Sequence, residues 1–461
     1  MRRLTIALLG ALFVLDLYRG ATQSIVHDEA LTWQMYLATP WTAFFQIYDA
    51  NNHFLHTFLL KLVTGFFGYS EFAMRIPALA AAALLLWSTF RLGRLVVGET
   101  WLLPLFAVVV AANPLVLDFQ VAARGYGMGL ALLVFALERM LCYVQSDRRP
   151  QLLWHAAVGL SLAVMANLIY VVPAAVAAVA FARTAPKKPS LYRYFWLPIG
   201  VLALLFLMVI PVADMHKDNF YVGLTNVPDS LEMLGRQMVA HNDGWGRINA
   251  FTTLQYRSAQ VLGWLLLPLA TAAGLWFGWR GKTRPALWFA SVIVAGSWVA
   301  LILLHYLAGL LLPDDRTGLY LFPLWGFLLV ALAARLPGWG RWAPALLAVV
   351  LAGWYLVQIN WTQFMGWRYD ADTRAFLEEI RRENPGRNVR IGVSWQLEPS
   401  TQFYRTTRSW TWYETDSREA LQPGLDVYLL LAQDRDKLAA LNLEAVRTGD
   451  VSGTILARPK R

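Results

Sequence analysis

The sequence predicts an all-α polytopic membrane protein, with about eleven transmembrane helices and a small C-terminal α/β domain. Of its 461 residues, 57% are hydrophobic and only 15% are charged, whereas about a quarter of a soluble domain is charged. The 21 Trp and 18 Tyr residues suit a bilayer interface, which amphipathic rings favour. From Tyr369 onward the chain is charged and has no apolar run of membrane length, so we expect a soluble domain there.

The formal net charge of +10 does not indicate nucleic-acid binding. Lys and Arg lie mostly in short connectors between apolar runs, and they form no basic stripe interleaved with aromatic residues. The single cysteine, Cys142, excludes an intramolecular disulfide. The first apolar segment resembles a signal peptide but has no small-residue cleavage site before His27, so we expect an uncleaved first span.

A spanning helix needs about 20 mostly apolar residues. The candidate segments are residues 4–22, 72–97, 102–115, 127–144, 152–167, 169–183, 194–212, 259–279, 285–312, 319–334 and 343–359. The segments near residues 102 and 167 are short for a span. Residues 54–67 are also apolar but short, and they include His56 and Lys61, so we expect a helix on the membrane surface.

Basic residues predict the orientation of the chain. They occur at the N-terminus and then in every second connector, as Arg2, Arg3, Arg91, Arg94, Arg148, Arg149, Arg183, Lys187, Lys188, Arg193, Arg280, Lys282, Arg284, Arg335 and Arg341. The positive-inside rule therefore places the N-terminus inside and the C-terminus outside. This alternation holds only if residues 54–67 do not span the bilayer.

The outside segments are then residues 26–71, 118–124, 214–257, 313–316 and everything after Asn360. We expect a transmembrane domain at 1–360 and a soluble α/β domain at 361–461. In the latter, residues 372–384 and 434–441 are typical of helices, and residues 388–394 and 426–431 of strands. In the 214–257 loop we expect no more than a solvated segment that helps to select an acceptor.

The first outside loop begins with an acidic pair, Asp28-Glu29, directly after a span. A carboxylate at this depth can act as a general base, helped by a pKa that partial desolvation raises. The alternative is an ordinary acid that caps the helix near Ala30. His53 and His56 follow, three residues apart. They could bind phosphate when protonated, or bind a divalent metal together with Asp28; interfacial histidines beside a capping Asn52 are the alternative.

Two other outside segments contain an arginine beside an acid. Arg124 follows Asp118, and Arg316 follows Asp315. The planar guanidinium suits phosphate, and two arginines at one membrane face could hold a phosphodiester. Internal ion pairs, Asp118 with Arg124 and Asp315 with Arg316, are the alternative. Gly125, Gly127 and Gly129 permit a close approach of backbone or of neighbouring helices.

Taken in this order, the segments resemble GT-C glycosyltransferases, specifically the bacterial relatives of protein O-mannosyltransferases and of the lipid A aminoarabinose transferase. The resemblance covers about a quarter of the 461 residues, at 26–136 and 313–323. It depends on Asp28-Glu29, Asn52-His53, and residues 68–77 (GYSEFAMRIP), 123–126 (ARGY) and 315–323.

The resemblance implies a sugar donor linked to a polyprenyl phosphate and a base in the first outside loop. On this sequence it makes Asp28 the base, and Glu29 the residue that positions the acceptor or the base. It also gives phosphate-binding roles to Arg124 and Arg316, with Tyr126, Tyr320 and His53 as further contacts and Asp118, Asp315 and His56 as supporting residues. It requires no cofactor, although a divalent metal at Asp28 and His53 is possible. The implied location is the bacterial inner membrane, with the active site and the C-terminus in the periplasm.

The sequence departs from the family pattern at two positions. Many relatives carry Glu-Ala-Arg before the tyrosine, whereas here the first position is Ala122, and Asp118 lies a turn earlier. Relatives often have Arg-Tyr adjacent in the late segment, whereas here Leu319 precedes Tyr320. A transporter or flippase for a lipid-linked or anionic substrate is the alternative function, because intramembrane charges also mark substrate paths. The clustering of charge at one face, without an inverted repeat, argues against it.

Overall fold

The computed structural model describes residues 1–145, 148–185, 189–216, 219–220, 222–239, 249–280, 285–415 and 421–460. The topology-setting residues Lys187, Lys188, Lys282 and Arg284 lie outside this described part. By its backbone contacts the chain forms two compact units. The first comprises Met1–Leu17, Phe45–His56 and Pro77–Ile359, and the second Tyr18–Phe44, Thr57–Ile76 and Asn360–Arg461. The domain division expected at residue 360 stays a prediction.

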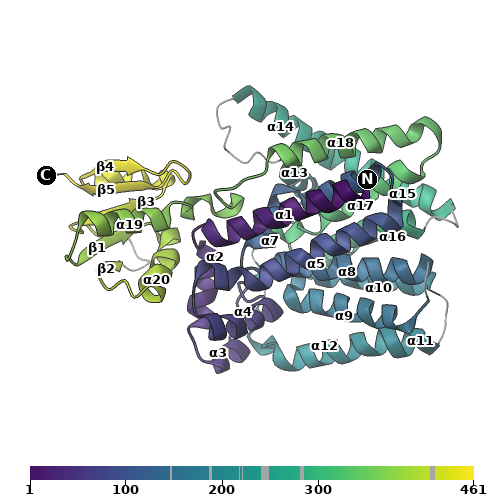
Figure 1. Ribbon diagram of the computed structural model, residues 1–461, viewed down its shortest axis with the longest axis horizontal. Coiled ribbons are helices and arrows are strands. Elements are labelled where there is room, and N and C mark those ends of the chain that lie inside the picture. Colours follow the sequence, from purple (N-terminus) through teal and green to yellow (C-terminus); the bar gives the residue numbers. More distant parts are fainter. Residues whose placement is uncertain are drawn as a thin grey trace. The chain divides into compact units, whose positions relative to one another are not determined.

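The first unit is helical (Figure 1). It holds most of α1 (Arg2–Thr22) and α5 (Glu71–Val97), and then α6 (Leu102–Ala111), α7 (Pro114–Val121), α8 (Gly125–Gln145), α9 (Pro150–Ala166), α10 (Val171–Thr184), α11 (Pro189–Leu191), α12 (Leu197–Val209), α13 (Val227–Met238), α14 (Asn249–Val261), α15 (Leu267–Arg280), α16 (Pro285–Ala308), α17 (Leu321–Arg335) and α18 (Trp342–Val357). Helix α8 packs on α9, α16 contacts α10, α15 and α17, and α6 packs between α17 and α18.

Each of the eleven apolar segments is helical over most of its length, but eleven spans are not confirmed. Among the described residues, seven helices are long and apolar enough to cross a membrane, or up to eight if the bent pair α6 and α7 forms one span. Helices α9, α17 and the segment Leu168–Thr184 are apolar but shorter, as is α4 (Phe54–Phe67). The chain is thus a multi-pass membrane protein. The surface location of α4 and the orientation of the chain remain predictions.

The break between α6 and α7 bends the chain by 64° at a single Asn-Pro step. Asn113 has extended backbone angles, because the proline that follows disfavours a helical conformation there. Its side-chain oxygen accepts from the main-chain nitrogens of Leu115 and Val116, and Pro114 takes the first helical position. This arrangement begins α7, the helix that carries Asp118.

The second unit contains a five-stranded sheet of order β2-β1-β3-β5-β4. The strands are β1 (Val389–Val393), β2 (Tyr413–Thr415), β3 (Val427–Leu430), β4 (Leu443–Thr448) and β5 (Ile455–Pro459). β1 pairs in parallel with β2 and β3, whereas β5 pairs antiparallel with β3 and β4. Its helices are α2 (His27–Thr32), α3 (Trp41–Gln46, in part), most of α4, α19 (Thr373–Glu383), α20 (Glu398–Thr407) and α21 (Lys437–Ala440).

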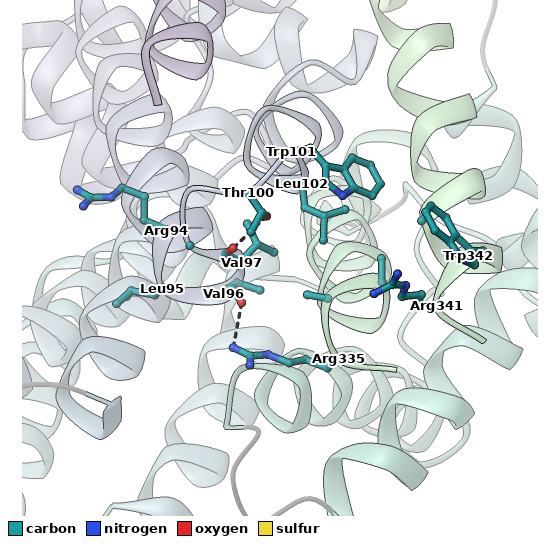
Figure 2. Close-up of a pocket in the computed structure, with 14 residues that line it drawn as sticks. Arg94, Leu95, Val96, Val97, Thr100, Trp101, Leu102, Arg335, Arg341 and Trp342 are labelled. Atoms are coloured by element: carbon teal, nitrogen blue, oxygen red, sulfur yellow. Dashed lines mark hydrogen bonds between the residues drawn. The ribbon is translucent and has the colours of Figure 1, made fainter. Parts of the chain in front are cut away.

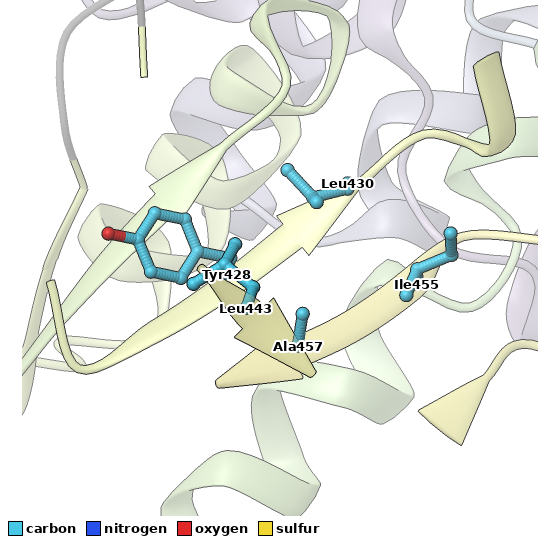
Figure 3. Close-up of a cluster of buried hydrophobic side chains, with 5 residues drawn as sticks. All are labelled: Tyr428, Leu430, Leu443, Ile455 and Ala457. Carbon is cyan, nitrogen blue, oxygen red and sulfur yellow. The ribbon is translucent and has the colours of Figure 1, made fainter. Parts of the chain in front are cut away.

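Side chains from three adjacent strands form a small buried core (Figure 3). It consists of Tyr428, Leu430, Leu443, Ile455 and Ala457. The register places Tyr428 opposite Ala457, and Leu430 opposite Ile455. Alternate residues of a strand point to one face, so these pairs pack together on the same side of the sheet. The C-terminal α/β domain is therefore confirmed, and with it the predicted fold class.

Candidate functional site

In the first unit, Arg124 is positioned by the turn between α7 and α8. Its main-chain nitrogen donates to the carbonyl oxygen of Ala122 at 2.6 Å, and α8 begins at the next residue. The side chains of Arg124 and Asp118 are buried, each residue being 2% exposed. Nη1 of Arg124 donates to the main-chain oxygen of Asn51 at 3.3 Å and to Oδ1 of the same residue. A guanidinium held in this way in an apolar protein is typical of a functional position.

The glycines of this turn are required by close backbone approach, as the sequence predicts. A Cβ atom on Gly125 would lie 2.0 Å from the carbonyl oxygen of Ala166 and 2.6 Å from Cβ of His53. On Gly127 it would lie 1.8 Å from the carbonyl oxygen of Phe119. Real Cβ atoms do not come so near, so only glycine lets α8 begin here. The turn thereby brings Arg124 and Tyr126 to the segment that carries His53.

His53 is buried, and its two ring nitrogens have different roles. Asn167 Oδ1 accepts from the main chain of Ile169, so its Nδ2 donates to Nδ1 of His53 at 3.0 Å. Burial lowers the pKa of His53 well below its usual range, and the charges of Arg124 and Arg316 lower it further. The neutral ring then carries its proton on Nε2, a buried donor without a hydrogen-bond partner among the described residues. The ring therefore offers one neutral N–H, and the phosphate-binding role expected for His53 stays a prediction.

Asp315 and Arg316 lie in a short 3-10 turn, η7 (Asp315–Gly318). The hydroxyl of Thr317 accepts from the main-chain nitrogen of Asp314, which fixes the turn. Asp315 has a left-handed backbone, with φ of 46°. Burial raises the pKa of Asp315 to about 6, Arg316 opposes this rise, and the neighbouring carboxylates of Asp314 and Asp118 add to it. Asp118 and Asp315 therefore lie within electrostatic range of each other.

Three tyrosines connect α8 with the residues that directly precede α10 and α17. The hydroxyl of Tyr170 donates to the main-chain oxygen of Tyr126 at 2.7 Å. Its ring lies 5.8 Å from that of Tyr320, and the ring of Tyr126 lies 4.8 Å from that of His53, centroid to centroid. Tyr126 and Tyr320 are both buried. The chain of aromatic contacts places the start of α17 beside the Arg124 turn.

The structure thus brings eight predicted residues together in the first unit: Asp118, Arg124, Tyr126, His53, His56, Asp315, Arg316 and Tyr320. We call this group the arginine cluster. Several polar atoms in it are buried and have no hydrogen-bond partner within the described ranges, namely Nε2 of His53, Nε2 of His56 and Oδ1 of Asp315. Such a concentration is expected where a protein binds a polar ligand.

The acidic pair lies in the second unit, on α2, and its two members have different surroundings. Glu29 is fully buried and accepts from the main-chain nitrogen of Val26 at 3.1 Å, which caps the helix. Arg75 donates to both of its carboxylate oxygens and also to the main-chain oxygens of Gln23 and Ser24. Asp28, by contrast, is partly exposed. Glu29 holds the helix, and Asp28 is the more exposed member of the pair.

A third carboxylate lies beside the pair. Asp370 is fully buried, and it accepts from the main-chain nitrogen of His27 at 2.7 Å and from the hydroxyl of Ser400 at 2.7 Å. Burial raises the pKa of Asp370 well above its usual range, the two hydrogen bonds oppose this, and the charges of Asp28 and Glu29 add to the rise. Asp370 thus helps to fix the start of α2.

Several of these residues are not predicted from the sequence. Asn51, Asn167 and Tyr170 position the arginine cluster, while Arg75 and Asp370 position the acidic pair. Arg75 could be identified from the sequence alone, because an arginine near the start of a span needs a buried partner. Within the described residues, no group of three or more His, Cys, Asp or Glu side chains is arranged to hold a metal ion. The metal suggested at Asp28 and His53 stays untested.

Among solved structures, the chain is similar to the arabinofuranosyltransferase AftD from Mycobacteria, at 14% identity and a TM-score of 0.51. That match covers 100% of this chain and 42% of AftD, so the chain spans less than half of AftD's length. The chain is also similar to ArnT from Cupriavidus metallidurans in the apo state, at 13% identity, with 98% and 97% of the two chains covered and a TM-score of 0.45. No protein-family model matches the sequence, and no curated protein matches it significantly. The likeness to AftD confirms the predicted GT-C fold.

Proposed function

We propose that this chain is an integral-membrane glycosyltransferase that moves a sugar from a polyprenyl phosphate to a lipid, glycan or protein acceptor. The observation that carries the proposal is the arginine cluster. It presents two guanidinium groups and the N–H of a neutral histidine from segments far apart in the sequence. Forked cationic donors and a neutral donor suit the oxygens of a phosphate group. The GT-C fold, shared with an arabinofuranosyltransferase, supports the same conclusion.

The reaction needs one base and one stabilised leaving group. Asp28 accepts the proton of the acceptor hydroxyl or amine, whose oxygen or nitrogen then attacks the anomeric carbon. The bond from that carbon to the phosphate oxygen breaks on the opposite side, so the configuration inverts. The polyprenyl phosphate departs with the electron pair, and Arg124 and Arg316 stabilise its charge. Nε2 of His53 donates to a phosphate oxygen, and Tyr126 and Tyr320 line the site.

Glu29 acts through position rather than contact with the substrate. Its buried ion pair with Arg75 fixes α2, the helix on which Asp28 lies. Asp370 accepts a hydrogen bond from the main-chain nitrogen of His27 and so helps to fix the same helix.

We place the protein in a bacterial inner membrane, with the N-terminus in the cytoplasm and the transfer reaction at the periplasmic face. The alternation of basic connectors supports this orientation. A donor on a lipid phosphate suits that face, because the glycosyl bond is already activated and no nucleotide need cross the membrane. No metal ion enters the proposed steps.

The proposal is tested with purified protein in detergent, a radiolabelled polyprenyl-phosphate-sugar pool and a panel of acceptors. Transfer by wild type and by Glu414→Gln, an exposed acid on β2, is compared with that by Asp28→Asn. We expect Asp28→Asn to abolish transfer without changing the thermal unfolding midpoint, and the control variant to stay active. Equal transfer by all three proteins would remove Asp28 from the base role. The absence of transfer by every protein, across the donor and acceptor panels, would favour a transporter.

A further inference from the structure

A second polar site lies in the first unit, remote in sequence from the arginine cluster. It is a cavity of about 530 Å³ where α5 and α17 end and α6 and α18 begin (Figure 2). Its volume falls within the range of about 300–1,000 Å³ typical of small-molecule sites. The four helix ends belong to connectors that the basic-residue pattern assigns to the cytoplasmic side.

The polar lining of the cavity is cationic. Arg335 and Arg341 line it, and Nη2 of Arg335 donates to the main-chain oxygen of Val96 at 3.1 Å, which holds the side chain in place. Arg94 also lines the cavity, but its guanidinium points away from the other two and pairs with Glu99 at 3.3 Å. No acidic side chain is among the cavity-lining residues that the structure describes. Arg335 and Arg341 therefore line the cavity, and no carboxylate among its described lining residues offsets their charge.

Two helix N-termini add to this positive potential. Helix α6 begins beside Trp101 and α18 begins at Trp342, and both tryptophans line the cavity. Neither helix has a side chain that caps its first turn. The dipole of a helix N-terminus favours an anion. The helix ends and the arginines thus point independently to the same ligand class.

The remaining walls are apolar and suit a lipid. The rings of Trp101 and Trp342 stack at 6.4 Å with an interplanar angle of 18°, and Arg341 lies over the Trp342 ring at 5.1 Å. Both tryptophans are exposed, as is usual at a membrane interface. Leu95, Leu102 and Ala345 complete the wall. A phosphate would meet the arginines while its glycerol and acyl groups contact the leucines and indoles.

We propose that this cavity binds the phosphate of an anionic phospholipid of the cytoplasmic leaflet. Basic pockets between transmembrane helices on this side of a membrane bind such head groups. A soluble phosphate compound would satisfy the same arginines but would not use the apolar wall. The proposal does not depend on glycosyl transfer, since none of the cavity residues belongs to the arginine cluster or the acidic pair.

The test is native mass spectrometry of the purified protein with added phosphatidylglycerol, phosphatidylcholine of the same acyl chains, inorganic phosphate or glycerophosphoglycerol. The test variant is Arg335→Gln/Arg341→Gln. The matched control is Arg148→Gln/Arg193→Gln, which removes two exposed arginines of the same predicted face outside the cavity. We expect the test variant to bind phosphatidylglycerol about thirtyfold more weakly than wild type, because two arginines are removed and each strengthens binding by about tenfold or less. The control should bind like wild type, and phosphatidylcholine should bind weakly to every protein.

An equal loss of phosphatidylglycerol binding in both variants, or no loss in either, would contradict the proposed site. If inorganic phosphate or glycerophosphoglycerol bound as tightly as phosphatidylglycerol, the result would contradict a lipid as the ligand of the cavity. A second measurement needs no variant: wild-type protein is labelled with a photoactivatable phosphatidylglycerol carrying its reactive group near the phosphate. We expect adducts in residues 94–102 and 333–345. Adducts confined to other segments would contradict the proposal even if the variants failed to fold.

Discussion

Arg75 donates from Nε and Nη2 to the two carboxylate oxygens of Glu29, at 3.0 and 2.7 Å, and both side chains are fully buried. The pair joins the first turn of α2 to the start of α5, and it leaves Asp28 as the exposed member of the acidic pair. Glu29 thus has a structural role, and the proposed base is its neighbour Asp28.

Glu29→Gln should destabilise the protein strongly, because it leaves the Arg75 guanidinium buried without its counter-charge. Breaking one partner of a buried pair costs about 3–5 kcal/mol. The matched control is Glu383→Gln, which removes a partner of Arg458 in a pair whose side chains are about 40% exposed, at 41% and 38%. That change should cost about 1 kcal/mol or less. Equal thermal unfolding midpoints for the two variants in detergent would contradict the structural role of Glu29.

Gly125→Ala should prevent correct folding of the Arg124 turn. The added Cβ would lie 2.0 Å from a main-chain oxygen, and neither backbone segment can yield that far. Gly353→Ala in α18 is the control, since nothing lies within 4 Å of its Cβ position. It should raise stability by about 1 kcal/mol or leave it unchanged, because alanine favours a helix more than glycine does. Folded, monodisperse Gly125→Ala protein in size-exclusion chromatography would argue against the close approach.

Asp315→Asn should stabilise the protein in a pH-dependent way. The folded-state pKa of Asp315 is about 6, above its ordinary value of 3.8. Below pH 3.8 the carboxyl is protonated in both states, so the variant and wild type should match. As the pH rises towards 6 the unfolded state ionises first, and wild type loses stability that the variant keeps. The difference in unfolding midpoint should therefore grow from pH 4 to 6 and stay constant above it. A difference that is independent of pH would contradict the buried environment of Asp315.

Arg316→Lys should lower transfer more than a surface change of the same kind. A lysine keeps the charge but loses the planar fork that matches two phosphate oxygens. Removing one such stabilising contact costs about a hundredfold or more in kcat. Arg193→Lys, an exposed residue elsewhere in the first unit, should leave kcat unchanged. If the two variants had equal rates at saturating donor, Arg316 would not stabilise the leaving phosphate.

The membrane helices could be predicted because long apolar runs dominate the sequence. Those near residues 72, 127 and 285 begin within about two residues of α5, α8 and α16, which is the usual accuracy of helix boundaries. Among the C-terminal elements, α19, β1 and β3 could be predicted. Strands β2, β4 and β5 and helix α20 could not be predicted, because such short segments owe their structure to tertiary packing. The helix expected at residues 434–441 is reduced to α21, Lys437–Ala440.

The chemistry-bearing residues could be named from the sequence, but their partners could not. Arg75 lies 46 residues from Glu29, and Asn167 lies 114 residues from His53. No local pattern reports contacts at such separations. The same holds for the protonation of His53, since its neutral state follows from burial next to two arginines. The sequence identifies charged side chains whose burial in a membrane costs free energy, but only the fold shows which opposite charges pair.

The most direct test of the account measures both products of one turnover by the purified protein in detergent. Polyprenyl phosphate and glycosylated acceptor are quantified from a known amount of polyprenyl-phosphate-sugar, for wild type and Asp28→Asn. The account predicts equal amounts of the two products from wild type and neither from the variant. Donor that stays intact with wild type, under conditions where it is bound, would contradict glycosyl transfer and favour movement of the lipid without chemistry.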